Sequence, residues 1–209
     1  MLSQSNAYIR SVLKPDGGAL LRSLEASGRG RGISLVLPET AAVLKQLVYL
    51  KRPSKILEIG TATGYSGIIM LSMFAGAELT TIEIDEDLCA EARRNFEAAG
   101  LSPRVSVFNG DASEILPLTD GEFDFVFLDG PKAHYSEYLP FIKKRLKRGG
   151  LLACDNVLFG GMVSGEIPCG KRGSLVRKLD SFLRAVCSDP DFLASVIPVG
   201  DGLCAAVLL

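Results

Sequence analysis

The sequence predicts an α/β protein in which a largely parallel sheet carries helices on both faces. Short apolar runs alternate with longer helical patterns, which is the order of a parallel sheet with helical crossovers. Glycine or polar residues follow each apolar run, at the strand ends where such sheets bind ligands. We expect strands over 55–60, 79–84, 105–108, 123–128 and 151–154, and helices over 64–74, 85–100, 135–148 and 173–187. A hairpin of 193–199 and 203–208 around Gly200-Asp201-Gly202 adds one antiparallel strand.

Residues 1–50 form a helical annex before the first strand, and 51–209 form the core of the same single domain. Two short helices, over 3–13 and 17–27, are separated by Pro15-Asp16-Gly17-Gly18. A third helix begins near Pro38, because proline and the glutamate after it suit a first turn.

The most informative stretch is KILEIGTATGYSG, at residues 55–67. Its apolar start indicates a strand buried on both faces. The spacing Gly60-x-x-x-Gly64 lacks the middle glycine of the dinucleotide fingerprint, because Ala62 stands in the turn. This favours an adenosine cofactor without pyrophosphate, S-adenosylmethionine (SAM), with its carboxylate near Ser66 at the helix N-terminus. A tight turn that binds no ligand is the alternative.

Acidic residues follow the second and third strands. Glu83 ends the second strand, where an acid accepts hydrogen bonds from ribose hydroxyls, so we predict it as the ribose ligand. Asp85, Glu86 and Asp87 fit the first turn of the next helix better than Glu83 does. Asp111 and Ala112 follow the third strand and would meet the adenine, although an aspartate at a helix N-cap would look the same.

Two basic stretches have structural interpretations. Arg29-Gly30-Arg31-Gly32 reads as a mobile basic loop, with a solvated surface turn as the favoured alternative. The run Lys143 to Arg148 closes a helix that stops at Gly149-Gly150, and cations there complement the helix dipole. This structural interpretation outweighs nucleic-acid binding for the second run.

Three oxygen donors stand at the ends of the fourth and fifth strands: Asp129, Asp155 and Asn156. Two carboxylates and an amide form a ligand set suited to Mg²⁺, Mn²⁺ or Ca²⁺. The alternative is that these side chains cap a loop and a helix. Lys132 can face the same cavity, where a nearby divalent cation would favour the neutral amine needed in a general base. His134, the only histidine, is interpreted as a surface or packing residue.

Composition is that of an ordinary globular protein of 209 residues, with 47% apolar and 22% charged residues. No stretch is apolar for long enough to cross a bilayer, and the N-terminus lacks a signal-peptide pattern, so we expect a cytoplasmic protein. Five dispersed cysteines without a C-x-x-C pair indicate neither disulfides nor a zinc site. A net charge of −1 gives no global attraction to nucleic acid.

The segments LEIGTATGYSG, TIEID, GDA, LDGPK and DNVLFGG, in this order, resemble the cation-dependent O-methyltransferases, the family of catechol and caffeoyl-CoA O-methyltransferases. The resemblance implies a Rossmann-like, seven-stranded class I SAM methyltransferase sheet, and a methyl acceptor that is a small catechol-like or vicinal-diol compound. It implies Mg²⁺ or a similar cation on Asp129, Asp155 and Asn156, Lys132 as the catalytic lysine, and a homodimer. The implied SAM ligands are Val36, Glu58, Gly60, Ser66, Glu83, Asp111, Ala112 and Asp129.

The C-terminal part looks more particularly like the bacterial branch that methylates 5-hydroxyuridine at the wobble position of tRNA. In that alternative Lys171, Arg172, Arg177 and Lys178 would face phosphate. One basic patch beside the site, formed by these residues and the run at 143–148, would favour tRNA over the small acceptor. A nicotinamide reductase is disfavoured by the missing glycine. A non-catalytic nucleotide-binding module would predict a lost lysine or metal ligand, and all four are present.

Overall fold

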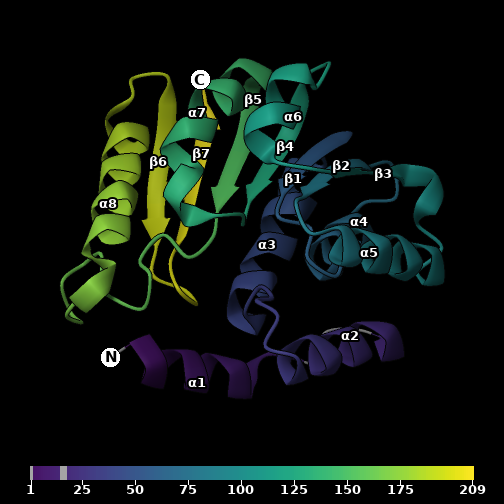
Figure 1. The fold of residues 1–209 in the computed structure, drawn as a ribbon, viewed down its shortest axis with the longest axis horizontal. Coiled ribbons are helices and arrows are strands. Elements are labelled where there is room, and N and C mark those ends of the chain that lie inside the picture. Colours follow the sequence, from purple (N-terminus) through teal and green to yellow (C-terminus); the bar gives the residue numbers. More distant parts are fainter. Residues whose placement is uncertain (1, 15–17) are drawn as a thin grey trace.

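The structure is a computed structural model that describes residues 2–14 and 18–209. Its strands form one seven-stranded sheet in the order β3-β2-β1-β4-β5-β7-β6 (Figure 1). Only β7 runs antiparallel to its neighbours, which confirms the predicted parallel sheet with a closing antiparallel hairpin. The strands are β1 Lys55–Ile59, β2 Glu78–Glu83, β3 Val105–Asn109, β4 Phe123–Leu128, β5 Leu146–Cys154, β6 Phe192–Ile197 and β7 Leu203–Leu208.

Helices cover both faces of the sheet, as predicted. The side chains of α3, α4 and α5 pack in the core on one face, and those of α6, α7 and α8 pack in the core on the other. The helices are α1 Leu2–Val12, α2 Gly18–Gly30, α3 Pro38–Lys51, α4 Tyr65–Met73, α5 Glu86–Ala98, α6 Ala112–Leu118, α7 Tyr135–Arg145 and α8 Gly173–Ser188. In the described part of the chain, no helix is long and apolar enough to cross a membrane.

Strand β4 shows why the central strands are continuously apolar. Phe125 and Phe127 face the core under α3 and α4, whereas Val126 and Leu128 face the core under α7 and α8. All four side chains are fully buried. A strand covered on both faces has no polar side, so its sequence does not alternate. Truncating either phenylalanine to alanine would destabilise the fold by about 3–5 kcal/mol.

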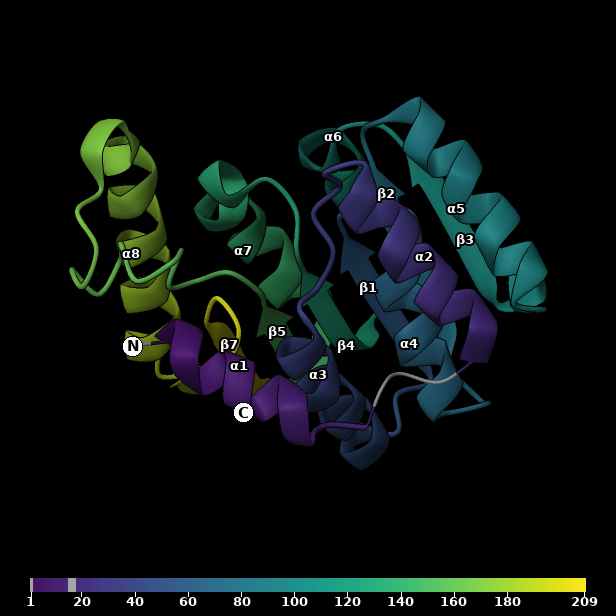
Figure 2. The ribbon, with the colours of Figure 1, turned by 90° about the horizontal axis from the view of Figure 1, so that it is seen from below.

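Helices α1 and α2 lie along the carboxyl edge of the sheet; in Figure 1, α1 is below the β5 and β6 arrowheads and α2 is below α4 and α5, and in Figure 2 both are in front of the strands. Two interactions attach α1 to the core. The Asn6 amide donates to the Gly200 carbonyl at 2.7 Å, and the Arg10 guanidinium binds both oxygens of the buried Glu39 carboxylate at 2.6 and 2.8 Å. The predicted break at Pro15-Asp16-Gly17 lies outside the described residues.

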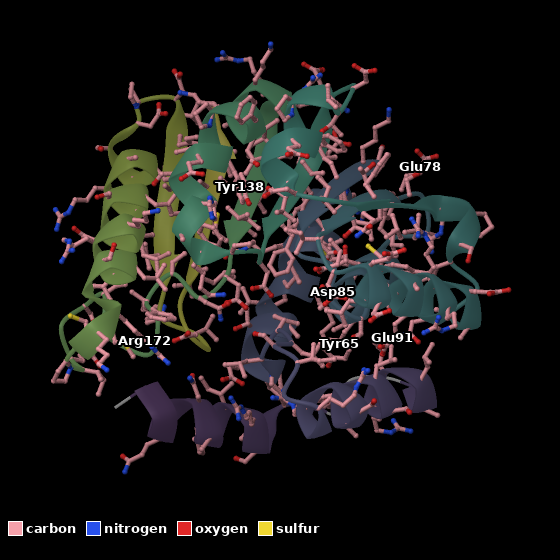
Figure 3. All side chains as sticks on the ribbon, viewed as in Figure 1. Tyr65, Glu78, Asp85, Glu91, Tyr138 and Arg172 are labelled. Carbon is pink, nitrogen blue, oxygen red and sulfur yellow. The ribbon has the colours of Figure 1, made fainter. Side chains whose placement is uncertain are left out.

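Residues 29–32 are exposed and Arg31-Gly32 forms a turn after α2, which agrees with the favoured alternative of a solvated surface turn and not with a mobile loop. Helix α2 continues to Gly30, and Arg29 pairs with Glu25 one turn earlier at 2.9 Å. The Arg31 guanidinium binds Glu91 on α5 at 2.6 Å, and Figure 3 shows Glu91 on the side of α5 that faces α2. Both arginines therefore have carboxylate partners that fix this segment.

The predicted helix over 135–148 is longer than the helix in the structure. Helix α7 ends at Arg145, and β5 begins at Leu146 with an irregular stretch before it pairs regularly with β4 from Leu151. Gly149 has a φ of +72°, a conformation that favours glycine. Lys147 binds Asp124 of β4 at 2.9 Å, so one of the predicted helix cations stabilises the start of the sheet instead.

Candidate active site

A cavity of about 410 Å³ opens at the carboxyl edge of β1, β2 and β4. The strand order reverses between β1 and β4, which is where open α/β sheets bind ligands. Its size is in the range of small-molecule sites. It is lined by Ile33, Ser34, Leu35, Val36, Ile59, Gly60, Thr61, Ala62, Tyr65, Ser66, Ile82, Glu83, Ile84, Leu88, Gly110, Asp111, Ala112, Asp129, Gly130, Pro131, His134 and Tyr138.

The turn after β1 brings its backbone against β4. Gly60 has a φ of +97°, and a Cβ atom there would lie 2.4 Å from the carbonyl oxygen of Asp129. Only glycine allows this approach. Gly64, at φ +82°, is the N-cap of α4, and the first two residues of that helix, Tyr65 and Ser66, line the cavity. The predicted glycine turn is therefore present, and it forms the floor of the cavity.

Glu83 lies at the cavity, where the ribose ligand was predicted. Its two carboxylate oxygens accept the backbone N–H groups of Ala62 at 2.8 Å and Asp85 at 3.0 Å. Each oxygen keeps a second lone pair for a ligand hydroxyl. The carboxylate thus joins the turn after β1 to the end of β2. The predicted N-cap role belongs to Asp85, whose side chain accepts the Leu88 N–H.

For Asp111 the sequence left two interpretations open, a helix N-cap and a position beside the adenine, and the structure is compatible with both. Asp111 is the N-cap of α6, because its carboxylate accepts the Ser113 N–H at 2.8 Å, and it also lines the cavity together with Ala112. That hydrogen bond lowers the pKa of Asp111 and keeps the side chain ionised. Val36, from the segment between α2 and α3, is 3% exposed and lines the same cavity.

Glu58 is fully buried and is not among the cavity-lining residues. Its carboxylate accepts the hydroxyls of Ser66 at 2.5 Å and Thr81 at 2.6 Å, and Thr81 in turn contacts the Thr61 hydroxyl at 2.6 Å. Burial raises the pKa of Glu58 to about 7. Of the predicted SAM ligands, Glu58 therefore reaches the cavity only through Ser66, whose hydroxyl it orients.

Asp129, Asp155 and Asn156 emerge side by side from β4 and β5. Leu128 and Cys154 are partners in the register, so the next residues, Asp129 and Asp155, leave neighbouring strands at the same level. The Asp155 N–H donates to the Leu128 carbonyl at 3.0 Å. The hydroxyl of Tyr135 lies 3.3 and 3.2 Å from the Leu128 and Asp155 carbonyls, and this tyrosine was not foreseen from the sequence.

Two oxygens of this group are buried without a protein partner, Asp155 Oδ2 and Asn156 Oδ1. The other Asp155 oxygen accepts the Asn156 N–H at 2.7 Å. Burial and the nearby Asp129 carboxylate both raise the pKa of Asp155. Unpaired buried acceptors beside a second carboxylate are costly without a cation. The donor set therefore fits a hard divalent ion better than the predicted capping alternative, and Asp129 caps no helix.

In the described residues, no three His, Cys, Asp or Glu side chains converge as a metal-binding group. The predicted set has only two such residues, because its third donor is the amide of Asn156. Lys132 lies close to it, with its amine nitrogen 3.9 Å from Asp129 Oδ1. Asp129 lines the cavity, and the structure places Lys132, Asp155 and Asn156 next to it, through the 3.9 Å contact of Lys132 and the register of β4 and β5.

Two aromatic residues from α7 and the segment before it complete this end. His134 lines the cavity while its Nδ1 atom pairs with Glu137 at 2.6 Å and its ring stacks on Tyr138 at 6.0 Å between centroids. This agrees with the predicted packing role. Figure 3 shows Tyr138 on α7. Tyr138 lines the cavity but was not predicted, although it follows Tyr135 at the helical spacing i+3 that puts both on one face.

The basic residues do not form one patch. Lys178 donates to the Ala133 carbonyl at 3.2 Å, next to Lys132, so the start of α8 lies beside the site. Figure 3 shows Arg172 at the end of the loop before α8. In contrast, Lys147 binds Asp124, which also accepts the backbone N–H groups that begin β1. The run at 143–148 is therefore at the opposite, amino edge of the sheet.

Comparison with known proteins gives a consistent result. Residues 21–208 match the model of a family described as O-methyltransferase. The catechol O-methyltransferase of Niastella koreensis is 34% identical over 165 residues, which are 76% of this chain and 75% of that protein. The structure of the Bacillus cereus O-methyltransferase in complex with SAH has 27% identity and a TM-score of 0.86, and covers 100% of both chains. The Streptomyces achromogenes O-methyltransferase TomG, in complex with SAM and involved in tomaymycin synthesis, has 26% identity and a TM-score of 0.83 over 98% of this chain and 96% of that one.

Proposed function

The chain belongs to the O-methyltransferase family, and we propose that it transfers a methyl group from SAM to a hydroxyl of a small catechol-like or vicinal-diol acceptor, with the help of a divalent cation. One observation carries this proposal. Asp155 Oδ2 and Asn156 Oδ1 are buried without a protein partner on the strand next to Asp129, which lines the cavity and has the Lys132 amine 3.9 Å away.

The cavity offers SAM a complementary group at each end. We assign the ribose hydroxyls to Glu83 and the adenine to the segment at Asp111 and Ala112. The carboxylate of SAM would meet the first N–H groups of α4 near Ser66. The SAH and SAM bound to the Bacillus cereus and Streptomyces achromogenes structures support SAM as the cofactor.

The divalent cation would be held by Asp129, Asp155 and Asn156, and we propose Mg²⁺ or Mn²⁺ because all three donors are oxygens. When bound, it would hold the acceptor oxygens, favour loss of their proton and favour the neutral form of the nearby amine. The amine of Lys132 then receives the proton from the acceptor hydroxyl. The hydroxyl oxygen forms a bond to the methyl carbon, the carbon–sulfur bond breaks, and its electron pair remains on sulfur in the SAH product. The protein contributes mainly by positioning the oxygen and the sulfonium in line.

A tRNA wobble base, 5-hydroxyuridine, is the second candidate acceptor. The basic side chains of Lys171, Arg172, Arg177 and Lys178 are exposed beside the site and favour a phosphate-bearing partner. The run at 143–148 lies at the other edge and adds nothing to that surface. We therefore rank the small acceptor first.

The assembly and cellular location are further parts of the proposal. We propose a homodimer, supported by exposed apolar side chains on α1 and α3, Tyr8, Val12, Tyr49 and Leu50. Light scattering of the purified protein tests it. We propose a cytoplasmic location, supported by five free cysteines.

Calorimetric titration of SAM with and without Mg²⁺, followed by methyl transfer to a dihydroxyphenyl compound and to tRNA bearing 5-hydroxyuridine, tests the function. Transfer to the small compound supports the first candidate. Transfer to the tRNA alone, reduced by Lys178→Ala and unaffected by Lys144→Ala, selects the second. Absence of SAM binding would overturn both.

A further inference from the structure

The turn between β6 and β7 holds the segment that follows Asn156. The Val157 N–H donates to the Gly202 carbonyl at 3.0 Å, and the Leu158 N–H donates to the Asp201 carbonyl at 3.0 Å. The Gly160 N–H donates to the Asp201 carboxylate. Three backbone donors directly after the predicted metal ligands therefore end on two residues of one hairpin turn.

This segment has a backbone conformation that needs such support. Asn156 and Phe159 have φ values of +57° and +48°, in the left-handed region where a non-glycine residue is strained. The turn packs directly against the segment, since a Cβ atom on Gly202 would lie 2.4 Å from the Leu158 side chain. The contacts with the turn offset the strain and fix the direction in which Asn156 leaves β5.

The carboxylate of Asp201 also belongs to the electrostatic surroundings of the site. Asp201 is partly buried, and its carboxylate accepts the Gly160 N–H, four residues after Asn156. Its charge therefore lies close to the segment that follows the predicted ligands. Asp201 is not one of the three predicted ligands, and the sequence showed it only as the centre of a Gly-Asp-Gly turn.

We propose that Asp201 is a positioning residue for the cation site of Asp129, Asp155 and Asn156. By accepting the Gly160 N–H it holds the strained segment and so fixes the direction in which Asn156 leaves β5 after Asp155. Its negative charge also favours a divalent cation on the neighbouring ligands. This role rests on the proposed function, because it concerns the same cation.

The test uses the purified full chain, and it measures Mn²⁺ affinity by titration and SAM affinity by calorimetry. Asp201→Ala is expected to weaken Mn²⁺ binding by about 10- to 100-fold, while SAM affinity stays within about twofold. Asp201→Asn retains an acceptor for Gly160 but loses the charge, so its fall should be smaller. In the metal-free protein, hydrogen exchange at the Gly160 amide should be faster in Asp201→Ala than in Asp201→Asn.

Asp124→Ala is the matched control. Asp124 also accepts backbone N–H groups, those of Ser54 and Lys55, but at the opposite edge of the sheet. Its loss should reduce stability and leave Mn²⁺ affinity unchanged. If Asp201→Ala binds Mn²⁺ as tightly as wild type, or if Asp124→Ala loses as much Mn²⁺ affinity as Asp201→Ala, the role of Asp201 is overturned. Neither result would affect the proposed function. If Asp201→Ala does not fold, an unchanged affinity in Asp201→Asn overturns this role. Wild-type protein that binds SAM but no Mn²⁺ would overturn the cation in the proposed function, and this role with it.

Discussion

Replacing Gly60 with alanine should damage the cofactor cavity and the cation site together. The new methyl group would lie 2.4 Å from the Asp129 carbonyl oxygen and 2.8 Å from the Asp129 carbonyl carbon, about 1 Å closer than an ordinary contact. These neighbours are backbone atoms, which cannot rotate away. The turn after β1 and the end of β4 must therefore separate, and this movement displaces Asp129 from Asp155.

The expected loss of stability has two parts. An alanine at a φ of +97° is strained by about 1–2 kcal/mol, and overpacking against fixed atoms adds about 1–3 kcal/mol. We therefore expect Gly60→Ala to lower the free energy of unfolding by about 2–5 kcal/mol. Gly100→Ala isolates the first part, because Gly100 has a φ of +68° and a Cβ atom there would meet nothing within 4 Å. It should lose only about 1–2 kcal/mol.

Urea unfolding and SAM calorimetry measure the two consequences. Gly60→Ala should bind SAM at least about tenfold more weakly, since the floor of the cavity moves, while Gly100→Ala should bind it like wild type. If Gly60→Ala is as stable as Gly100→Ala and binds SAM normally, the close approach of Gly60 and Asp129 is not what shapes the cavity.

Three further predictions address the site and its support. Lys132→Met should lower kcat by about 10²- to 10⁴-fold with SAM affinity nearly unchanged, and a loss confined to SAM binding would contradict its role as a base. The pKa of Glu58 is raised from 4.5 to about 7, so the folded protein retains a proton that the unfolded chain loses. The contribution of this proton to the free energy of unfolding is fully present below pH 4.5 and is lost as the pH rises through 7. Glu58→Gln should therefore flatten the pH dependence of the free energy of unfolding between pH 5 and 7.5, and an unchanged slope would contradict the assignment. Arg10→Ala leaves the buried Glu39 carboxylate unpaired and should reduce stability at pH 7 by about 2–3 kcal/mol, less than for a fully buried pair because Arg10 is half exposed. The Arg10 hydrogen bond lowers the pKa of Glu39, so this loss should shrink as the pH falls below 4.5, and thermal unfolding across pH would show it.

Much of the fold followed from local patterns. Apolar runs bounded by turn residues identified all seven strands, and the pattern was clearest in β1 and β4, which are buried on both faces. The contacts at 29–32 and the error at 146–148 both depend on partners distant in sequence. Arg31 is fixed by Glu91 and Lys147 by Asp124, and neither pairing can be inferred from neighbouring residues.

Residue type at strand ends predicted which side chains lie together, as for Asp129, Asp155 and Lys132, and their roles stay predictions. The site was less predictable where function depends on burial. Glu58 was expected to contact the cofactor, yet it lies beneath Ser66 in the structure. From the sequence, Asp201 was recognised only as part of a turn, because its hydrogen bond with Gly160 joins residues 41 positions apart.

The central claim is that a cation on Asp129, Asp155 and Asn156 is required for methyl transfer. The most direct measurement is the rate of SAH formation with the accepted hydroxyl compound, after treatment with EDTA and after addition of Mg²⁺ or Mn²⁺, in wild type and Asp155→Ala. We predict that EDTA abolishes the activity of the wild type, that the metal restores it, and that Asp155→Ala stays inactive while still binding SAM. Full methyl transfer in EDTA, or by Asp155→Ala, would show that the reaction does not need a cation on these residues.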